Sequence, residues 1–302
     1  MRNRNLYNAL AIAAASASMA AAQSVSVPGR DLLAYPVGLI AESGALPNML
    51  GLGTYNPAAA WLPDGARWRL AAGSMNTAQD AGASAQTFGA SARWRAATIS
   101  LAVTRAGVAG LVRTDSDPLT VEDDIAYYTL VTSLGVAYRA SPHVTLGAAT
   151  RYWSGRLDTD ARSRAVVDVG AVVDHLTRFD ARVGASTFLF SPGGGAANPP
   201  TWLAAADARV AGRDSLREVR VGVSTSTTAG RPSEDFVYGS ARIGIWELRG
   251  GPVRTTAYGA SNLRGRLALA VHYAGYAVGL AREETPSGLA PTYQFVLSSA
   301  GK

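Results

Sequence analysis

The sequence predicts an all-β protein, a transmembrane antiparallel up-and-down β-barrel of about 14 strands with an N-terminal plug or hatch segment. Three observations support this fold class. Apolar side chains alternate with small or polar ones along many short segments, short and long connections alternate between these segments, and arginines stand singly on the small or polar faces. After residue 22 no run approaches the roughly 20 apolar residues that a membrane helix needs, whereas a barrel strand turns only every second side chain towards lipid.

The alternation is clearest in residues 125–153, where two segments flank a turn at Ala140-Ser141-Pro142. Because side chains alternate across a strand with period two, these segments predict an antiparallel hairpin with one apolar face. The other face, from Thr129 to Arg139 and from Thr145 to Arg151, holds Gly, Ser, Ala, Thr, Val and Arg, which favours a wet lumen. Aromatic residues near the ends of the apolar face are typical of membrane interfaces; they are Tyr128, Tyr138 and Tyr152. A soluble exported β-protein, with two sheets enclosing a dry core, is the alternative.

Residues 1–22 have the pattern of a secretory signal peptide. Arg2 and Arg4 precede an apolar stretch, and three alanines form a small-residue cleavage site before Gln23. An N-terminal membrane anchor is the alternative, although the apolar stretch is short for one. We therefore expect export to the outer membrane, with both barrel termini in the periplasm. The absence of Cys excludes disulfides and thiolate chemistry.

Residues 23–65 predict a hatch rather than a strand. Prolines and glycines interrupt this segment at short intervals, yet it is apolar for a loop. Because it lies directly ahead of a barrel, we expect it to be buried in the lumen. A loosely ordered periplasmic tail is the alternative.

Residues 66–302 predict the barrel. The expected strands are 66–75, 84–94, 96–105, 125–139, 143–153, 163–174, 178–190, 201–211, 216–227, 235–247, 252–259, 265–273, 276–283 and 291–299. Tight connections are expected around Arg95-Ala96, Ala140-Pro142, His175-Thr177, Gly212-Asp214, Gly250-Gly251 and Ala274-Gly275. Longer ones are expected at 76–83, 106–124, 154–162, 191–200, 228–234, 260–264 and 284–290. Outer-membrane barrels show this rhythm of short periplasmic turns and long external loops.

Arginines on the small or polar faces are the candidate functional residues. An arginine at the lipid midplane costs roughly 2–4 kcal/mol, so these side chains are expected in the lumen. There they could bind the hatch, attract anionic solutes or pair with Asp168, Asp180 and Asp207. The candidates are Arg93, Arg139, Arg151, Arg182, Arg220 and Arg242.

Catalysis, metal binding and nucleic-acid binding are not predicted. The three histidines lack a second ligand at metal-binding spacing, and no base can be assigned to Ser224 or Ser226. Gly193–Gly195 is not part of a strand–helix phosphate loop. The arginines are dispersed rather than clustered with aromatic residues, so a nucleic-acid partner is not expected despite the pI of about 9.8. We expect no cofactor.

The stretch from Gly51 to Trp61, GLGTYNPAAAW, resembles the hatch motif of FadL-type long-chain fatty acid transporters and of PorV/PorQ-like outer-membrane proteins. The strand from Leu134 to Tyr138 and the closing strand from Tyr293 to Leu297 are also similar to that group. Ala59 departs from the usual glycine, and the chain ends on Lys302 rather than an aromatic residue.

The resemblance implies a 14-stranded barrel whose hatch is shaped by Asn56, Pro57 and Ala58. Such a barrel would lie in outer-membrane lipid. It would carry hydrophobic or small anionic solutes, or it would dock an exported partner or a secretion-system component.

Overall fold

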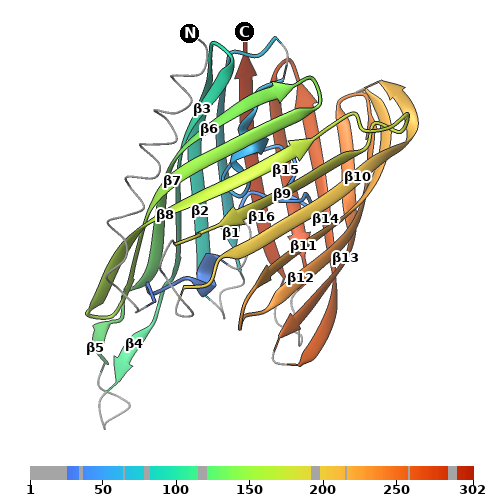
Figure 1. Cartoon of the computed structure of the whole chain (residues 1–302). Helices are drawn as coiled ribbons and strands as arrows, with labels where there is room; N and C mark the ends of the chain where they lie inside the picture. Colours follow the sequence, from blue (N-terminus) through green and yellow to red (C-terminus); the bar gives the residue numbers. More distant parts are fainter. Residues whose placement is uncertain are drawn as a thin grey trace.

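The computed structural model describes residues 26–33, 37–63, 65–77, 82–114, 121–191, 198–214, 216–257, 259–284 and 291–302. The predicted signal peptide lies outside the described residues. In the described part of the chain, fourteen strands close into one antiparallel barrel, and β4 and β5 form a separate two-stranded sheet (Figure 1). The predicted fold class is confirmed at the level of this closed up-and-down barrel.

The strands pair in chain order, and β1 closes the barrel against β16 with Trp68 opposite Gly301. The barrel strands are β1 (Trp68–Asn76), β2 (Ala83–Trp94), β3 (Ala97–Val108), β6 (Tyr127–Ser141), β7 (Val144–Leu157), β8 (Asp160–Val173), β9 (Arg182–Phe188), β10 (Thr201–Asp214), β11 (Arg217–Thr228), β12 (Ser233–Ile243), β13 (Trp246–Ala257), β14 (Ala260–Tyr273), β15 (Tyr276–Glu283) and β16 (Thr292–Gly301). The two remaining strands are β4 (Val112–Thr114) and β5 (Val121–Asp124).

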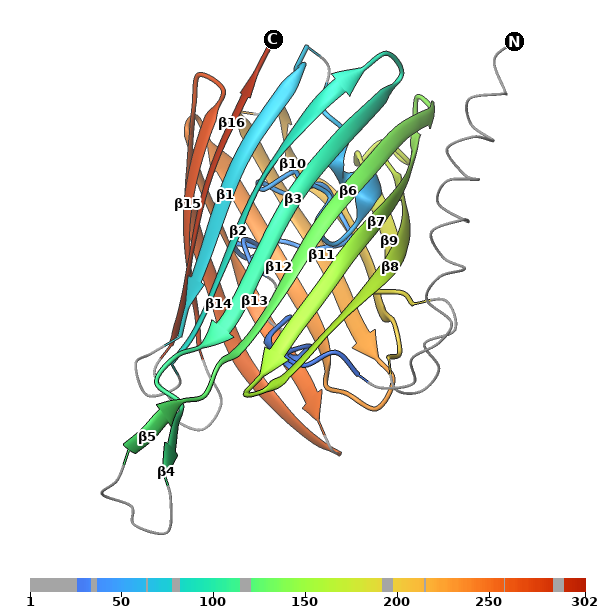
Figure 2. The same ribbon diagram turned by 90° about the vertical axis from the view of Figure 1, so that its left-hand side faces the viewer.

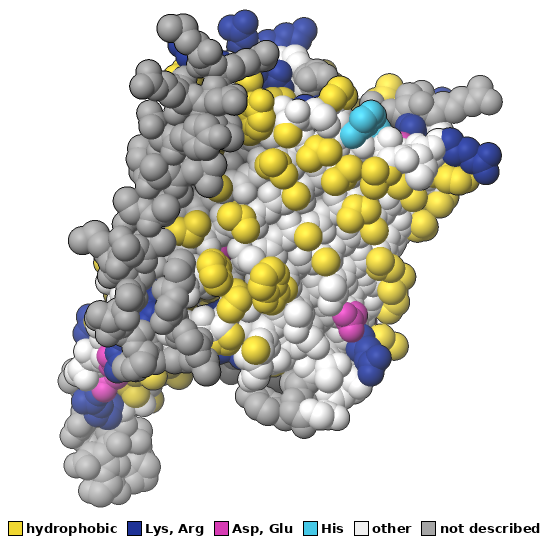
Figure 3. Space-filling view, viewed as in Figure 1, with side chains coloured by type: hydrophobic (Ala, Val, Ile, Leu, Met, Phe, Trp, Pro, Cys, Tyr) yellow, Lys and Arg dark blue, Asp and Glu magenta, His cyan; other side chains and the backbone are white. Residues whose placement is uncertain are grey.

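The apolar side chains of the strands point outward. In β6, Leu134, Val136 and Tyr138 are exposed, whereas Ser133 and Ala137 are buried. The outer wall therefore carries dispersed apolar side chains (Figure 3). The alternative of two stacked sheets around a dry core is wrong, because a single sheet closes on itself with its apolar side outside.

Most exposed aromatic side chains lie towards the two ends of the wall, whereas Phe88 and Phe295 are exposed between them. Those near the tight turns are Trp68, Trp94, Tyr138, Phe179, Trp246, Tyr273 and Tyr276, and those nearer the other end are Tyr152, Trp202 and Tyr293. Indole and phenol rings of this kind favour the lipid–water interface, so the apolar band between them matches a bilayer.

Most tight turns lie at one end of the barrel, which we call the turn end; the opposite end is the loop end. Three predicted connections are wrong here. Gly212–Asp214 belongs to β10, which ends at Asp214. Gly250-Gly251 lies inside β13, and the preceding turn is at Gly244 and Ile245, where Gly244 has a φ of 62°. The connection around His175 spans the eight residues 174–181 instead of three.

Some connections at the loop end are shorter than the sequence predicts. The predicted long connections 154–162 and 260–264 are shorter, because β7 continues to Leu157 and β14 begins at Ala260. Polar residues extend these hairpins as paired strands beyond the apolar band. In contrast, the predicted 106–124 loop includes the β4–β5 hairpin, which projects from the loop end (Figure 2).

Residues 26–33 and 37–63, which we call the hatch, run through the barrel interior. They contain two short 3-10 helices, η2 (Asp31–Leu33) and η3 (Pro57–Ala60). Near η2, Tyr127 donates a hydrogen bond to Asp31 at the loop end, at 2.5 Å. The hatch then crosses the lumen and leads into β1 at the turn end (Figure 2). None of the helices in the described ranges has the length and apolarity needed to cross a membrane.

Candidate functional site

Glycines of the barrel wall provide the seats on which the hatch lies. A Cβ atom added to Gly147 would lie 2.1 Å from Ala58 N, and one added to Gly170 would lie 2.0 Å from Asn56 Oδ1. The same holds at Gly155, Gly184 and Gly279, which face Pro28 O, Ala45 O and Ile40 Cδ1 at 1.9–2.1 Å. Any larger residue would displace the hatch, so part of the predicted wet face is a dry contact surface.

Asn56 fixes the hatch at β8. Its Oδ1 accepts a hydrogen bond from Ala58 N at 3.0 Å and so caps η3, while Pro57 occupies the first turn. Its Nδ2 donates to Ala45 O at 2.6 Å and to Ala171 O at 3.3 Å. The predicted hatch residues Asn56, Pro57 and Ala58 therefore lie together, completely buried against β7 and β8.

Replacement of Asn56 by alanine is expected to loosen the hatch by about 2 kcal/mol, because a helix cap and two buried amide hydrogen bonds are lost. Proteinase K should then cleave the N-terminal segment of the detergent-solubilised barrel faster than in the parent protein. Asn262→Ala, which removes an exposed amide of β14, is the control and should leave the rate unchanged. Equal rates for both variants would contradict the anchoring role.

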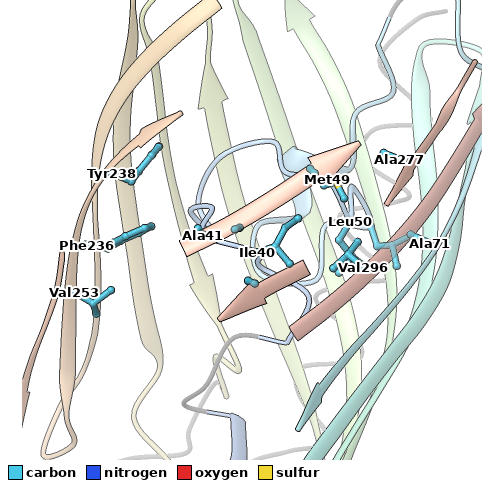
Figure 4. Close-up of a cluster of buried hydrophobic side chains, with 14 of the residues drawn as sticks. Ile40, Ala41, Met49, Leu50, Ala71, Phe236, Tyr238, Val253, Ala277 and Val296 are labelled. Carbon is cyan, nitrogen blue, oxygen red and sulfur yellow. The ribbon is translucent and has the colours of Figure 1, made fainter. Parts of the chain in front are cut away.

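Apolar side chains of the hatch complete a core inside the lumen. Ile40, Met49 and Leu50 are buried in one cluster with wall residues Ala71 and Val296 (Figure 4). At the end nearest β1, Arg93 donates hydrogen bonds to Leu62 O at 2.5 Å and Pro63 O at 3.0 Å, and its guanidinium lies 5.0 Å from the centre of the Trp61 ring. The hatch is therefore held along its whole length.

The described residues line a cavity on each side of the hatch. The loop-end cavity has a volume of about 700 Å³ and the turn-end cavity about 840 Å³. Glu42 and Ser43 line both cavities. The hatch backbone at these two residues is thus the partition between two halves of one lumen.

The loop-end cavity is amphipathic. Leu33, Leu39, Tyr55, Phe188 and Leu203 line its apolar side, and hydroxyl groups from β11 line the other. At its rim, Arg30 donates to Pro199 O and lies 5.5 Å from the Trp153 ring. Burial lowers the pKa of Arg30 to about 10, with a further decrease from Arg231 and an opposing effect from Asp168.

The far wall of this cavity carries a closed network of charges. Arg264 donates to Glu234 at 2.7 Å, and Arg266 contacts both Glu234 and Glu283, at 3.1 Å and 2.7 Å. Arg264 also lies 2.7 Å from Glu283. Two arginines and two carboxylates balance one another, so this network stiffens the wall without adding net charge.

The turn-end cavity is lined by six arginines and five carboxylates. Asp207 accepts hydrogen bonds from Arg182 Nε at 2.8 Å and from Arg220 Nη2 at 2.8 Å. Arg220 also contacts Asp180 at 3.1 Å. By contrast, neither Arg69 nor Arg242 forms an ion pair with a carboxylate of the described residues.

A chain of charged groups links the hatch to this wall. Glu42 accepts hydrogen bonds from Met49 N at 2.9 and 3.1 Å and forms an ion pair with Arg249 of β13. Arg249 Nε also donates to Glu247 at 2.5 Å, and the other oxygen of Glu247 lies 2.8 Å from Nε2 of His272. These side chains connect the partition directly to the cavity surface.

The six arginines proposed from the sequence have different surroundings. Arg139, Arg182, Arg220 and Arg242 line the turn-end cavity, whereas Arg93 binds the hatch. Arg151 is completely buried, pairs with Asp168 and lies 5.2 Å from the Phe188 ring. Arg249 and Glu42 were missed. Continuing the alternation from Trp246 through the two glycines would have placed Arg249 in the lumen.

The two serines considered from the sequence, Ser224 and Ser226, line the loop-end cavity, and none of its described lining residues is a histidine. In the described part of the chain no set of three or more His, Cys, Asp or Glu is arranged to hold a metal ion.

Comparison with known proteins gives similarity in structure alone. No protein-family model matches the sequence, and no curated protein matches it. The toluene transporter TbuX of Ralstonia pickettii superposes with a TM-score of 0.59 and 11% identity, covering 87% of this chain and 97% of TbuX. The monoaromatic hydrocarbon channel CymD superposes with a TM-score of 0.58 and 12% identity, covering 87% of this chain and 96% of CymD. The Pseudomonas putida toluene transporter TodX superposes with a TM-score of 0.55 and 11% identity, covering 92% of this chain and 99% of TodX. The chain therefore has the fold of FadL-type barrels, as its Gly51–Trp61 motif predicts.

Proposed function

We propose that this protein is a passive transport barrel of the outer membrane whose hatch controls passage of small solutes. The observation that carries the proposal is the arrangement of the two cavities. They lie in one lumen, one towards each end, and Glu42 and Ser43 of the hatch line both of them. Movement of this short partition would join them into one path.

The outer surface supports a membrane location. Apolar side chains cover the wall between two belts of exposed aromatic residues, as lipid contact requires. We assign the turn end to the periplasm and the loop end to the exterior, because short turns and long loops divide in this way in such barrels.

The linings suggest the class of solute. A cavity of about 700 Å³ is within the range that holds one small organic molecule, and its apolar side faces a hydroxyl-lined side. The wall arginines of the second cavity would favour anions over cations. Small hydrophobic solutes fit the first cavity, and small organic anions fit the second. The names of the structural neighbours, a toluene transporter and a monoaromatic hydrocarbon channel, agree with the apolar part of this proposal.

Deletion of residues 27–62 tests the proposal. The shortened barrel should conduct more ions in a planar lipid bilayer than the parent, because the partition is gone. Heat-modifiable migration on a detergent gel would establish that the barrel still closes. A correctly closed barrel with unaltered current would overturn the transport function.

A second candidate function is docking of an exported partner through the loop end. The projecting β4–β5 hairpin, in which Val112 pairs with Asp124, favours it (Figures 1 and 2). Deletion of residues 109–126, which spares β3 and β6, should then abolish partner capture while solute flux stays unchanged. If the same deletion alters flux and leaves capture intact, docking is excluded.

A further inference from the structure

Glu42 occupies an unusual position for a charged side chain. It belongs to the hatch rather than the wall, it lines both cavities, and only 11% of its side chain is exposed. Arg249, which is also 11% exposed, provides its ion-pair partner from β13. This contact is the one ion pair between hatch and wall among the described residues for which both partners line the turn-end cavity.

Two further arginines, Arg69 and Arg242, line the same cavity as Arg249. Arg69 lies against the hatch backbone, where a Cβ on Gly51 would be 1.5 Å from its Nη1, and it interacts electrostatically with Glu42. Arg242, in the same cavity, donates to the backbone oxygen of Gly244 at 3.3 Å and forms no ion pair with a described carboxylate. Removal of the Glu42 carboxylate would therefore leave a cationic pocket that faces the turn-end cavity.

We propose that Arg249, with Arg69 nearby, is a carboxylate-binding site, and that the hatch closes the lumen by keeping Glu42 in this site as an internal ligand. The inference rests on the proposed transport function and adds its gating contact. A small organic monocarboxylate in the turn-end cavity would compete with Glu42 for the Arg249 guanidinium and so release the partition. A monocarboxylate presents to the guanidinium the same two acceptor oxygens as the Glu42 side chain.

Burial of the Glu42 carboxylate favours its replacement on Arg249 by a free carboxylate. Desolvation raises the pKa of the Glu42 carboxyl, against the opposing effects of Arg249 and the Met49 N–H. The closed hatch therefore holds a carboxylate that would be better hydrated outside, and an exchange that returns Glu42 to water recovers this hydration. Arg249 keeps Glu247 as a second partner throughout, so the wall need not rearrange.

The test is opening of the parent barrel by acetate. In a planar bilayer, replacement of chloride by acetate should raise the open fraction of the parent about fivefold, because acetate competes with Glu42 for Arg249 and releases the hatch. Glu42→Ala should already conduct more than the parent in potassium chloride, and acetate should not open it further, because it has no internal ligand to displace. Currents are normalised to the barrel lacking residues 27–62, which corrects for the lower mobility of acetate. Acetamide, which is neutral and of similar shape, should have no effect.

Two variants make the test specific. Arg249→Met should lose the acetate response, and Glu218→Ala, which removes a carboxylate of the same cavity without touching the hatch, should keep it. The inference is overturned if the parent ignores acetate, or if the response persists without Arg249. The transport function fails separately, if the barrel lacking the hatch conducts no better than the parent.

Discussion

A Gly147→Val barrel is expected to have a hatch that no longer fits its lumen. The first side-chain atom at this position would lie 2.1 Å from Ala58 N and 2.3 Å from the carbonyl carbon of Pro57, so backbone rather than a flexible side chain must move. Overpacking of this kind costs about 1–3 kcal/mol. Valine is favoured in strands, so β7 itself should pair normally.

The population of barrels with a displaced hatch is expected to rise roughly 5- to 150-fold, which corresponds to about 1–3 kcal/mol. It would appear as more frequent opening in single-channel recordings and as faster proteolysis of the N-terminal segment. Gly239→Val is the matched control. It makes the same change in β12, where the nearest atom to a new Cβ is 3.8 Å away and belongs to the wall. Similar currents for both variants would refute the seating of the hatch on Gly147.

Asp207→Ala should cause the largest loss of barrel stability among single substitutions in the turn-end cavity. Asp207 is 5% exposed and receives hydrogen bonds from both Arg182 and Arg220, while the Tyr238 hydroxyl lies 3.4 Å away. Arg182 has no other ion-pair partner among the described residues. Removal of one member of a buried charged group costs about 3–5 kcal/mol, because the remaining charges stay desolvated.

The measurement is urea-induced unfolding of the barrel in lipid vesicles, followed by tryptophan fluorescence. Asp160→Ala provides the comparison, because the Asp160–Arg162 pair at a loop-end turn is exposed and worth about 0–1 kcal/mol. A loss for Asp207→Ala no larger than that for Asp160→Ala would show that Arg182 and Arg220 find water or other partners.

The strands were predictable because their signal is local. In β6 and β7 the period-two pattern places each side chain on its observed face, from Thr129 to Tyr152. Errors arose where glycine was interpreted as a turn. Gly250 and Gly251 lie within a strand because a neighbouring strand approaches closely: a Cβ on Gly251 would be 2.0 Å from Val237 O. Sequence composition alone cannot separate this use of glycine from a turn.

The partners of the lumen arginines were not predictable in the same way. An ion pair such as Arg182 with Asp207 depends on the register between β9 and β10, which in turn depends on the conformation of the chain between them. The pairing of Arg249 with Glu42 depends further on how the hatch crosses the lumen, and no local pattern in residues 37–63 encodes that path. The sequence therefore predicts which face an arginine occupies, and only the structure identifies its partner.

The course of the hatch restricts how it could ever leave the barrel. Its first described residues lie at the loop end, and its last lead into β1 at the turn end, where β1 and β16 meet. A pull at the turn end on the junction with β1 would load β1 as well as the hatch, because the two are continuous in the chain. Extraction of the hatch towards that end would require the residues around Asp31 to travel the full length of the lumen.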